Sequence, residues 1–178
     1  MSFLTTNARI EQTEVPGIWQ TIDNQLYKDI DGSIYLVPRY YKTDNYTIPD
    51  WLAWLGGNKS KWDVRPSHFH DFGSQYHALI KVCMNEQTLR AKRLLRVKDD
   101  KIVCENIPIK FLKVEKKNKW FIDCMFKRMM KVANNIPTWR INLMRTAVFF
   151  NVGWLSNYYN EIDLNNLYKE QKGELECL

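Results

Sequence analysis

The sequence predicts an α+β fold in which a small antiparallel sheet and a hairpin pack on a mainly helical core. Two patterns indicate it: short β-type runs between turn residues near the start and around residue 95, and apolar residues at helical spacing elsewhere. The chain has 178 residues, of which 45% are hydrophobic and 13% aromatic. That is enough to bury one sizeable core, so we expect a single folded domain.

The first expected sheet comes from residues 18–22, 25–28 and 34–37, which are rich in β-branched and aromatic side chains. Asp31 and Gly32 lie between the last two runs and supply typical turn chemistry. A second hairpin is predicted from 94–97 and 102–104, with 98–101 as its turn. Residues 107–114 could add an edge segment.

Four helices are expected. Pro49 suits the start of a short helix over 50–55, and Pro66 with Ser67 suits the start of a helix that runs to about Met84. Asn118 begins an apolar helix to about residue 135, and Pro137 separates it from a long helix over 138–159. The last two helices are expected to form most of the core.

These elements divide the chain into three parts. Residues 1–16 lack periodicity and are predicted to be an N-terminal arm. Residues 17–162 form the single α+β domain, with a basic β insertion at about 90–117, and residues 163–178 form an acidic tail. We find no apolar run long enough to cross a bilayer and no signal-peptide pattern, which predicts synthesis in the cytoplasm.

Charge is unevenly distributed. The whole chain carries +6, but residues 79–145 hold 17 Lys or Arg against 6 Asp or Glu, a net +11. This middle region could meet nucleic acid or another anionic surface. The candidate anion-binding residues are Arg93, Arg96, Lys98, Lys116 and Lys117. The alternative is a solvated basic face with no ligand, or one that docks on a partner protein.

Three segments together carry a family resemblance. Residues 37–49 read VPRYYKTDNYTIP, His70-Asp71 follows, and Asp123 lies in a later predicted helix ahead of Val148-Phe149-Phe150-Asn151-Val152-Gly153. In order and rough spacing they resemble a bacteriophage family of unknown function with a V-P-x-x-F-x-T-D-x-x-S-I-P loop and a later His-Asp pair. The resemblance covers about residues 34–154.

The resemblance implies a phage origin and a compact α+β fold, without naming a reaction. We therefore expect a small virion-associated or assembly protein that acts through contacts with other phage structural proteins. It would be made in the host cytoplasm and could be incorporated in the virion. Its oligomeric state stays open.

The His-Asp pair supports an alternative hypothesis, a hydrolase acting on a lipid, peptidoglycan or a phosphoester. His70 and Asp71 on one helix and Asp123 on another are distantly similar to the His-Asp helix of phospholipases A2. That similarity implies His70 as general base, Asp123 or Asp44 as the group that orients it, and Asp71 as a ligand of calcium.

Each of these residues also has a structural interpretation. The ring of His70 could bond to Asp44 or Asp123 and fasten a loop to a helix. Asp123 could pair with Lys127 one turn later on its helix. Asp44 and Thr43 could cap a loop. The sequence leaves these interpretations open.

A divalent metal is also left open. Asp71 and His70 are the candidate ligands, because carboxylate and imidazole groups hold such ions. His68, His70 and His77 lie within one short window and could instead ligate zinc together with an acidic partner. No cofactor is firmly indicated.

Overall fold

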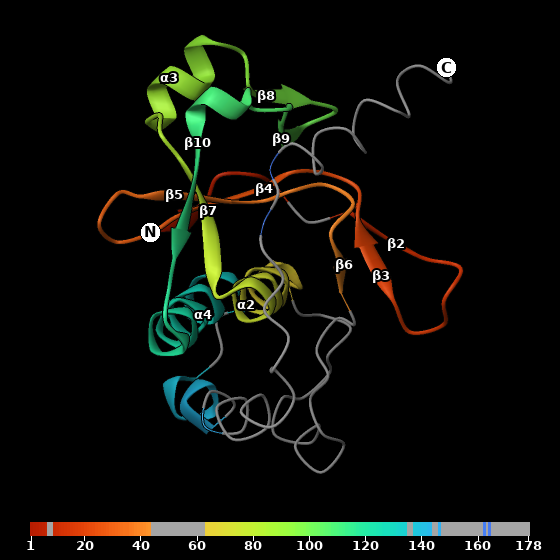
Figure 1. The fold of residues 1–178 in the computed structure, drawn as a ribbon, viewed down its shortest axis with the longest axis vertical. Helices are drawn as coiled ribbons and strands as arrows, with labels where there is room; N and C mark the ends of the chain where they lie inside the picture. The colour runs from red at the N-terminus through yellow and green to blue at the C-terminus, as the bar shows by residue number, and fades with distance from the viewer. Residues whose placement is uncertain are drawn as a thin grey trace.

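The computed structural model describes residues 1–6, 9–43, 63–134, 137–143, 146, 162 and 164. Its centre is an antiparallel sheet of five strands in the order β1-β4-β5-β7-β10. These strands are β1 (Ser2–Phe3), β4 (Gln25–Lys28), β5 (Ile34–Val37), β7 (Ala78–Val82) and β10 (Leu112–Lys116). Figure 1 shows the sheet crossing the middle of the molecule.

The hairpin of β4 and β5 confirms the turn predicted at Asp31 and Gly32. The Asp31 carboxylate accepts a hydrogen bond of 2.9 Å from the amide of Ser33, and Gly32 has a φ of +83°. Glycine adopts this left-handed backbone without steric cost, which explains its place in the turn. The sequence therefore fixes this hairpin locally.

A second, three-stranded sheet lies beside the first, in the order β2-β3-β6. It consists of β2 (Ile10–Gln12), β3 (Trp19–Thr21) and β6 (Lys42–Thr43). The predicted strand over 18–22 is confirmed, but it belongs to this sheet and not to that of β4 and β5. The segment predicted as an arm, 1–16, contains β1 and β2, and β1 is held by its pairing with β4.

The predicted helix over 67–84 is wrong in its second half. Helix α2 (Arg65–Tyr76) ends at His77, whose φ of 47° is left-handed, and residues 78–82 form strand β7. Four of the five residues of β7 are buried. A strand covered on both faces loses the alternating pattern that distinguishes strands from helices. The spacing of Leu79, Ile80 and Cys83 after Tyr76 therefore imitates a helix.

The predicted basic insertion, 90–117, contributes to two layers. Helix α3 (Glu86–Ala91) precedes the hairpin of β8 (Leu95–Lys98) and β9 (Lys101–Cys104), which confirms the second predicted hairpin. A 3₁₀ turn, η2 (Ile109–Phe111), leads into β10, which pairs with β7 at the edge of the main sheet. The hairpin turn uses left-handed Asp99 and Asp100.

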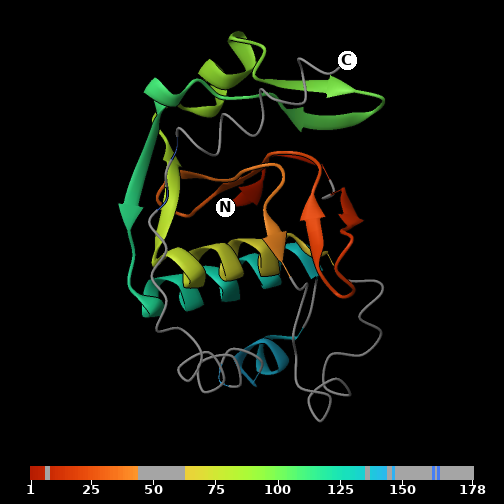
Figure 2. The same ribbon diagram turned by 45° about the vertical axis from the view of Figure 1, so that its right-hand side comes forward.

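Helix α4 (Lys119–Asn134) confirms the predicted helix over 118–135, and the Asn118 side chain caps it by accepting a bond of 2.9 Å from the Phe121 amide. The Lys117 amide donates to the carbonyl of His77, so the end of α2 lies beside the start of α4. The two helices thus run antiparallel under the main sheet, as Figure 2 shows. Residues 138–143 are helical.

The two faces of the main sheet are covered by different elements. Tyr27 and Tyr35 point to the helices, with their ring centroids 6.1 Å from Phe69 of α2 and 6.3 Å from Phe121 of α4. Because neighbours along a strand alternate, Leu26 and the other intervening residues point to the opposite face. Figure 2 shows α3 and the β8–β9 hairpin over that face.

The α+β class is confirmed, but the prediction of a mainly helical core is wrong. Strands β4, β5 and β7 supply much of the core, and Leu26, Leu36 and Leu79 are at most 1% exposed. The physical reason is that layers on both faces of the sheet bury alternate residues of the same strands.

Several predicted elements lie outside the described residues. These are the helix over 50–55, most of the helix over 138–159, and the acidic tail over 163–178 except residue 164. Within the described part of the chain, no helix combines the length and the apolar character needed to span a membrane.

Candidate functional site

The predicted site residues His70 and Asp71 lie in the middle of α2. The helix begins at Arg65, whose guanidinium pairs with Asp63, and Pro66 occupies its first turn. The Ser67 hydroxyl donates to the carbonyl of Val64 over 2.7 Å. Proline fits the first turn of a helix because its missing N–H would have no intrahelical partner there.

His70 and Asp123 meet across the contact between α2 and α4. His70 Nε2 lies 3.1 Å from Asp123 Oδ1, a direct hydrogen bond, which confirms the predicted approach of these two residues. Lys119 Nζ donates to the other carboxylate oxygen of Asp123 over 3.0 Å. The predicted pairing of Asp123 with Lys127 is therefore wrong: Asp123 pairs with Lys119, one turn earlier on the helix.

The contact between His70 and Asp123 is sealed from solvent. His70 is 4% exposed and Asp123 is 1% exposed. The ring of Phe126 packs against the imidazole with centroids 4.9 Å apart. A Cβ placed on Gly73 would come within 3.1 Å of the Ile122 side chain, so glycine permits the close approach of the two helices one turn beyond His70.

The second ring nitrogen of His70 faces its neighbour Asp71. His70 Nδ1 lies 3.6 Å from Asp71 Oδ1, and Asp71 Oδ2 accepts a hydrogen bond of 2.6 Å from the Thr43 hydroxyl of β6. The Asp71 side chain is 29% exposed. A chain of contacts therefore joins the second sheet to α2 and α2 to α4.

The carboxylates determine the protonation of this cluster. Burial alone would lower the pKa of His70, but the bond to Asp123 and the nearby Asp71 outweigh it and raise that pKa above 6.5. Burial would raise the pKa of Asp123, yet the bonds from His70 and Lys119 hold it below 3.8. The arrangement therefore favours an imidazolium between two carboxylates.

His68, two residues earlier on α2, has a different environment. Its Nδ1 lies 2.8 Å from the side-chain nitrogen of Gln25 on β4, and the residue is 0% exposed. Burial lowers the pKa of His68 to about 4, against a smaller opposing effect of Asp71. Its imidazole is neutral at physiological pH.

The zinc hypothesis is wrong for the described residues. His68 bonds to Gln25 and His70 to Asp123, so the histidines do not converge on one point. No three His, Cys, Asp or Glu side chains in the described parts of the chain are arranged to hold a metal ion. Asp71 and His70 alone offer two ligating groups, and Asp44, the third predicted site residue, lies outside the described residues.

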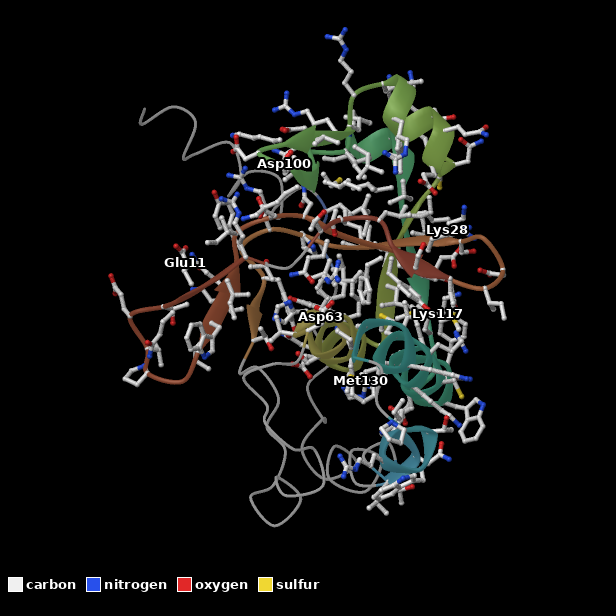
Figure 3. The ribbon with its side chains drawn as sticks, turned by 180° about the vertical axis from the view of Figure 1, so that it is seen from behind. Glu11, Lys28, Asp63, Asp100, Lys117 and Met130 are labelled. Carbon is white, nitrogen blue, oxygen red and sulfur yellow. The ribbon has the colours of Figure 1, made fainter. Side chains whose placement is uncertain are left out.

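The predicted anion-binding residues do not form one surface. Arg93, Arg96 and Lys98 are exposed on the side of α3 and the hairpin, and Arg96 pairs with Glu105 at 2.5 Å. Lys116 and Lys117 lie at the far end of β10, where it enters α4. Lys117 pairs with Glu115 at 3.0 Å, and Figure 3 shows it beside α4.

Sequence reasoning missed Lys119, a member of the cluster, and Gln25, the partner of His68. Lys119 neutralises Asp123, and its i,i+4 spacing was a usable signal. Gln25 binds His68 across 43 positions, and no local pattern indicates that contact. Thr43, predicted to cap a loop, instead bonds to Asp71.

The cluster can hold charge and fasten elements together. To act as a general base, a histidine must be neutral and must reach a water or a substrate. The imidazole of His70 meets neither condition, because it is buried and its two nitrogens face carboxylates. Searches with protein-family models, among curated proteins and among solved structures found no match to this chain.

Proposed function

We propose that this chain is a bacteriophage protein without enzymatic activity, which acts through protein–protein contacts in the virion or in its assembly. One observation carries the non-enzymatic part: His70, the strongest catalytic candidate, is 4% exposed and bonds to the buried Asp123. The phage origin rests on the resemblance carried by residues 37–49, His70-Asp71 and Asp123. The partners would be other phage structural proteins, met in the host cytoplasm.

In this proposal the cluster has a structural task. It joins α2 to α4 through His70 and Asp123, and it joins α2 to β6 through Asp71 and Thr43. Removing one partner of a buried charge pair is strongly destabilising, so such a pair favours the one arrangement of the elements in which both partners meet. A binding protein needs such a fixed framework to present its surface.

The test is association in infected cells. A tagged chain is expressed during infection, complexes are purified, and mature particles are analysed separately by mass spectrometry. We expect the chain in particles, or in a stable complex with a phage structural protein. Its absence from both, in repeated preparations in which known structural proteins are recovered, would contradict the proposal.

The hydrolase remains the second candidate, because the bond of 3.1 Å between His70 and Asp123 has the geometry of a base and the group that orients it. A His70→Gln variant that stays folded should lose all turnover if His70 is the base. The matched control is His68→Gln, which alters the other buried histidine of α2. Hydrolysis of a lipid, peptidoglycan or phosphoester that is lost only in His70→Gln would favour the enzyme.

A further inference from the structure

The outer side of α4 combines cations with an aromatic residue. At about 100° per residue, Trp120, Lys127 and Lys131 fall within about 40° of one another around the helix axis. Trp120 is 62% exposed, Lys131 is exposed and Lys127 is half-buried. The opposite side carries residues such as Met125 and Met129, which are fully buried. The stripe is therefore a solvent-facing feature of a well-anchored helix.

Strand β10 leads into this helix. It is an edge strand, and its exposed Lys113 and Lys116 are three residues apart, so they point to opposite faces of the strand and lie outside the stripe. Lys117, at the junction, lies with its Nζ 4.5 Å from the ring centroid of Phe121 and holds the strand end against the first turn of α4. We call Trp120, Lys127 and Lys131 the α4 surface.

No acidic residue of β10 or α4 neutralises the positive charge of the α4 surface. Glu115 is the only acidic residue of β10, and it pairs with Lys81 and Lys117. Asp123 is the only acidic residue of α4, and it is buried against His70 and Lys119. Within the described parts of the chain, the two lysines of the α4 surface, Lys127 and Lys131, form no ion pair.

We propose that the α4 surface binds single-stranded nucleic acid. Lysines engage phosphates as point charges, and those one helical turn apart, such as Lys127 and Lys131, are separated by about 6 Å along the axis. An exposed indole among them offers a face on which an unpaired base can stack, a contact typical of proteins that bind single strands. The ligand class follows from this pairing of charge with an aromatic ring.

Two other partners fit the α4 surface less well. A membrane-bound helix inserts a broad apolar face beside its basic one, whereas the stripe carries only Trp120 as a large apolar group. A duplex keeps its bases stacked inside and would use the lysines but not the indole. Both partners therefore serve as outcomes of the test.

The test measures the anisotropy of a labelled oligothymidylate of about 20 nucleotides, which exceeds the roughly 4 to 16 nucleotides that such sites occupy. The full chain is titrated at about 50 mM salt and at higher salt, where electrostatic binding weakens. A duplex of the same length and vesicles with an anionic phospholipid are titrated in parallel. The variants are Trp120→Ala and Lys127→Gln/Lys131→Gln. The control, Lys98→Gln/Lys101→Gln, removes the same charge from the hairpin on the other side of the sheet.

We expect Lys127→Gln/Lys131→Gln to weaken oligothymidylate binding about tenfold and to reduce the salt slope by about 1.4, at about 0.7 for each single-strand phosphate contact. Trp120→Ala should weaken it at least about fivefold, the lower range for losing one stacked base. The control should bind like the unaltered chain. Circular dichroism checks that each variant is folded.

Four results would overturn the proposal. They are no binding of the oligothymidylate at low salt, an equal loss in the hairpin control, tighter binding of the duplex with no effect of Trp120→Ala, and binding of vesicles alone. The last two would assign the α4 surface to duplex nucleic acid and to membranes, respectively.

Discussion

His68 and His70 are two residues apart on α2 and both are buried, but they favour different protonation states. His68 meets the neutral amide of Gln25 on the sheet, and burial lowers its pKa to about 4. His70 meets the carboxylates of Asp123 and Asp71, and despite burial its pKa is raised above 6.5. The same side chain on the same helix thus takes two protonation states.

The difference teaches that the partner, and not burial alone, decides the charge of an interior histidine. Residues two apart on a helix point about 200° apart. His68 therefore faces the main sheet, whereas His70 faces α4. The contact of α2 with the sheet is neutral, and its contact with α4 contains an ion cluster.

Removing a carboxylate should have the largest effect. Asp123→Ala leaves the imidazolium of His70 buried without its main partner, and we expect a loss of about 3 to 5 kcal/mol in the free energy of unfolding. Gln25→Ala is the matched change on the His68 side, and it should cost only about 1 to 3 kcal/mol because no charge is left unpaired. Urea unfolding followed by circular dichroism measures both. Equal losses in the two variants would contradict the proposed difference between the charged contact of His70 and the neutral contact of His68.

The two histidines should contribute oppositely to the pH dependence of stability. The folded pKa of His68 is depressed, so its contribution is complete above about 6.5 and is lost as pH falls toward 4. The shift from 6.5 to about 4 corresponds to roughly 3 kcal/mol. The folded pKa of His70 is raised, so its contribution is present below 6.5 and is lost as pH rises through that folded value.

Denaturant unfolding at a series of pH values checks this. His68→Gln, which cannot titrate, should flatten the fall in stability between pH 6.5 and 4. His70→Gln should leave that fall in place and remove a loss at higher pH. If His68→Gln loses as much stability between pH 6.5 and 4 as the unaltered chain, a group other than His68 causes that loss.

The close approach of α2 and α4 at Gly73 should matter to a smaller degree. Gly73→Val adds a branched side chain where even a Cβ comes within 3.1 Å of Ile122. We expect a destabilisation of about 1 to 3 kcal/mol from overpacking. The same substitution at Gly17 has nothing within 4 Å of its Cβ, so its cost reflects only the positive φ of 82°. If Gly73→Val left the free energy of unfolding unchanged, the two helices could move apart without cost.

The smallest expected effect is at Thr43. Thr43→Val removes the hydroxyl that donates to Asp71, and because the Asp71 side chain is 29% exposed, water can replace the bond. We expect about 1 kcal/mol or less. Thermal unfolding of the variant beside the unaltered chain measures it. A loss as large as that of Asp123→Ala would place Asp71, and not Asp123, at the centre of the cluster.

The sequence predicted what depends on local chemistry. Asp31-Gly32 and Asp99-Asp100 both form hairpin turns, since left-handed backbone is available to these residue types. Strand β7 was mistaken for helix because both its faces are buried, although the run Ala78-Leu79-Ile80-Lys81-Val82 contains β-type residues without a helix cap. Local pattern cannot reveal burial on two sides.

The candidate site was predicted only in part. The meeting of His70 with Asp123 came from the family resemblance, not from spacing, because the two residues are 53 positions apart. That the contact between His70 and Asp123 is sealed and charged depends on the packing of Phe126 and on Lys119 and Asp71, which only the tertiary structure brings into place.

The charge of His70 is the most direct test of the account. Nuclear magnetic resonance of the imidazole nitrogens follows each histidine through a pH titration and distinguishes neutral from charged rings. At pH 6.5, where an ordinary histidine is about half protonated, we predict that His70 is mostly charged and that His68 is neutral until pH approaches about 4. A His70 ring that is mostly neutral at pH 6.5 would contradict the structural role proposed for the cluster and would fit a general base.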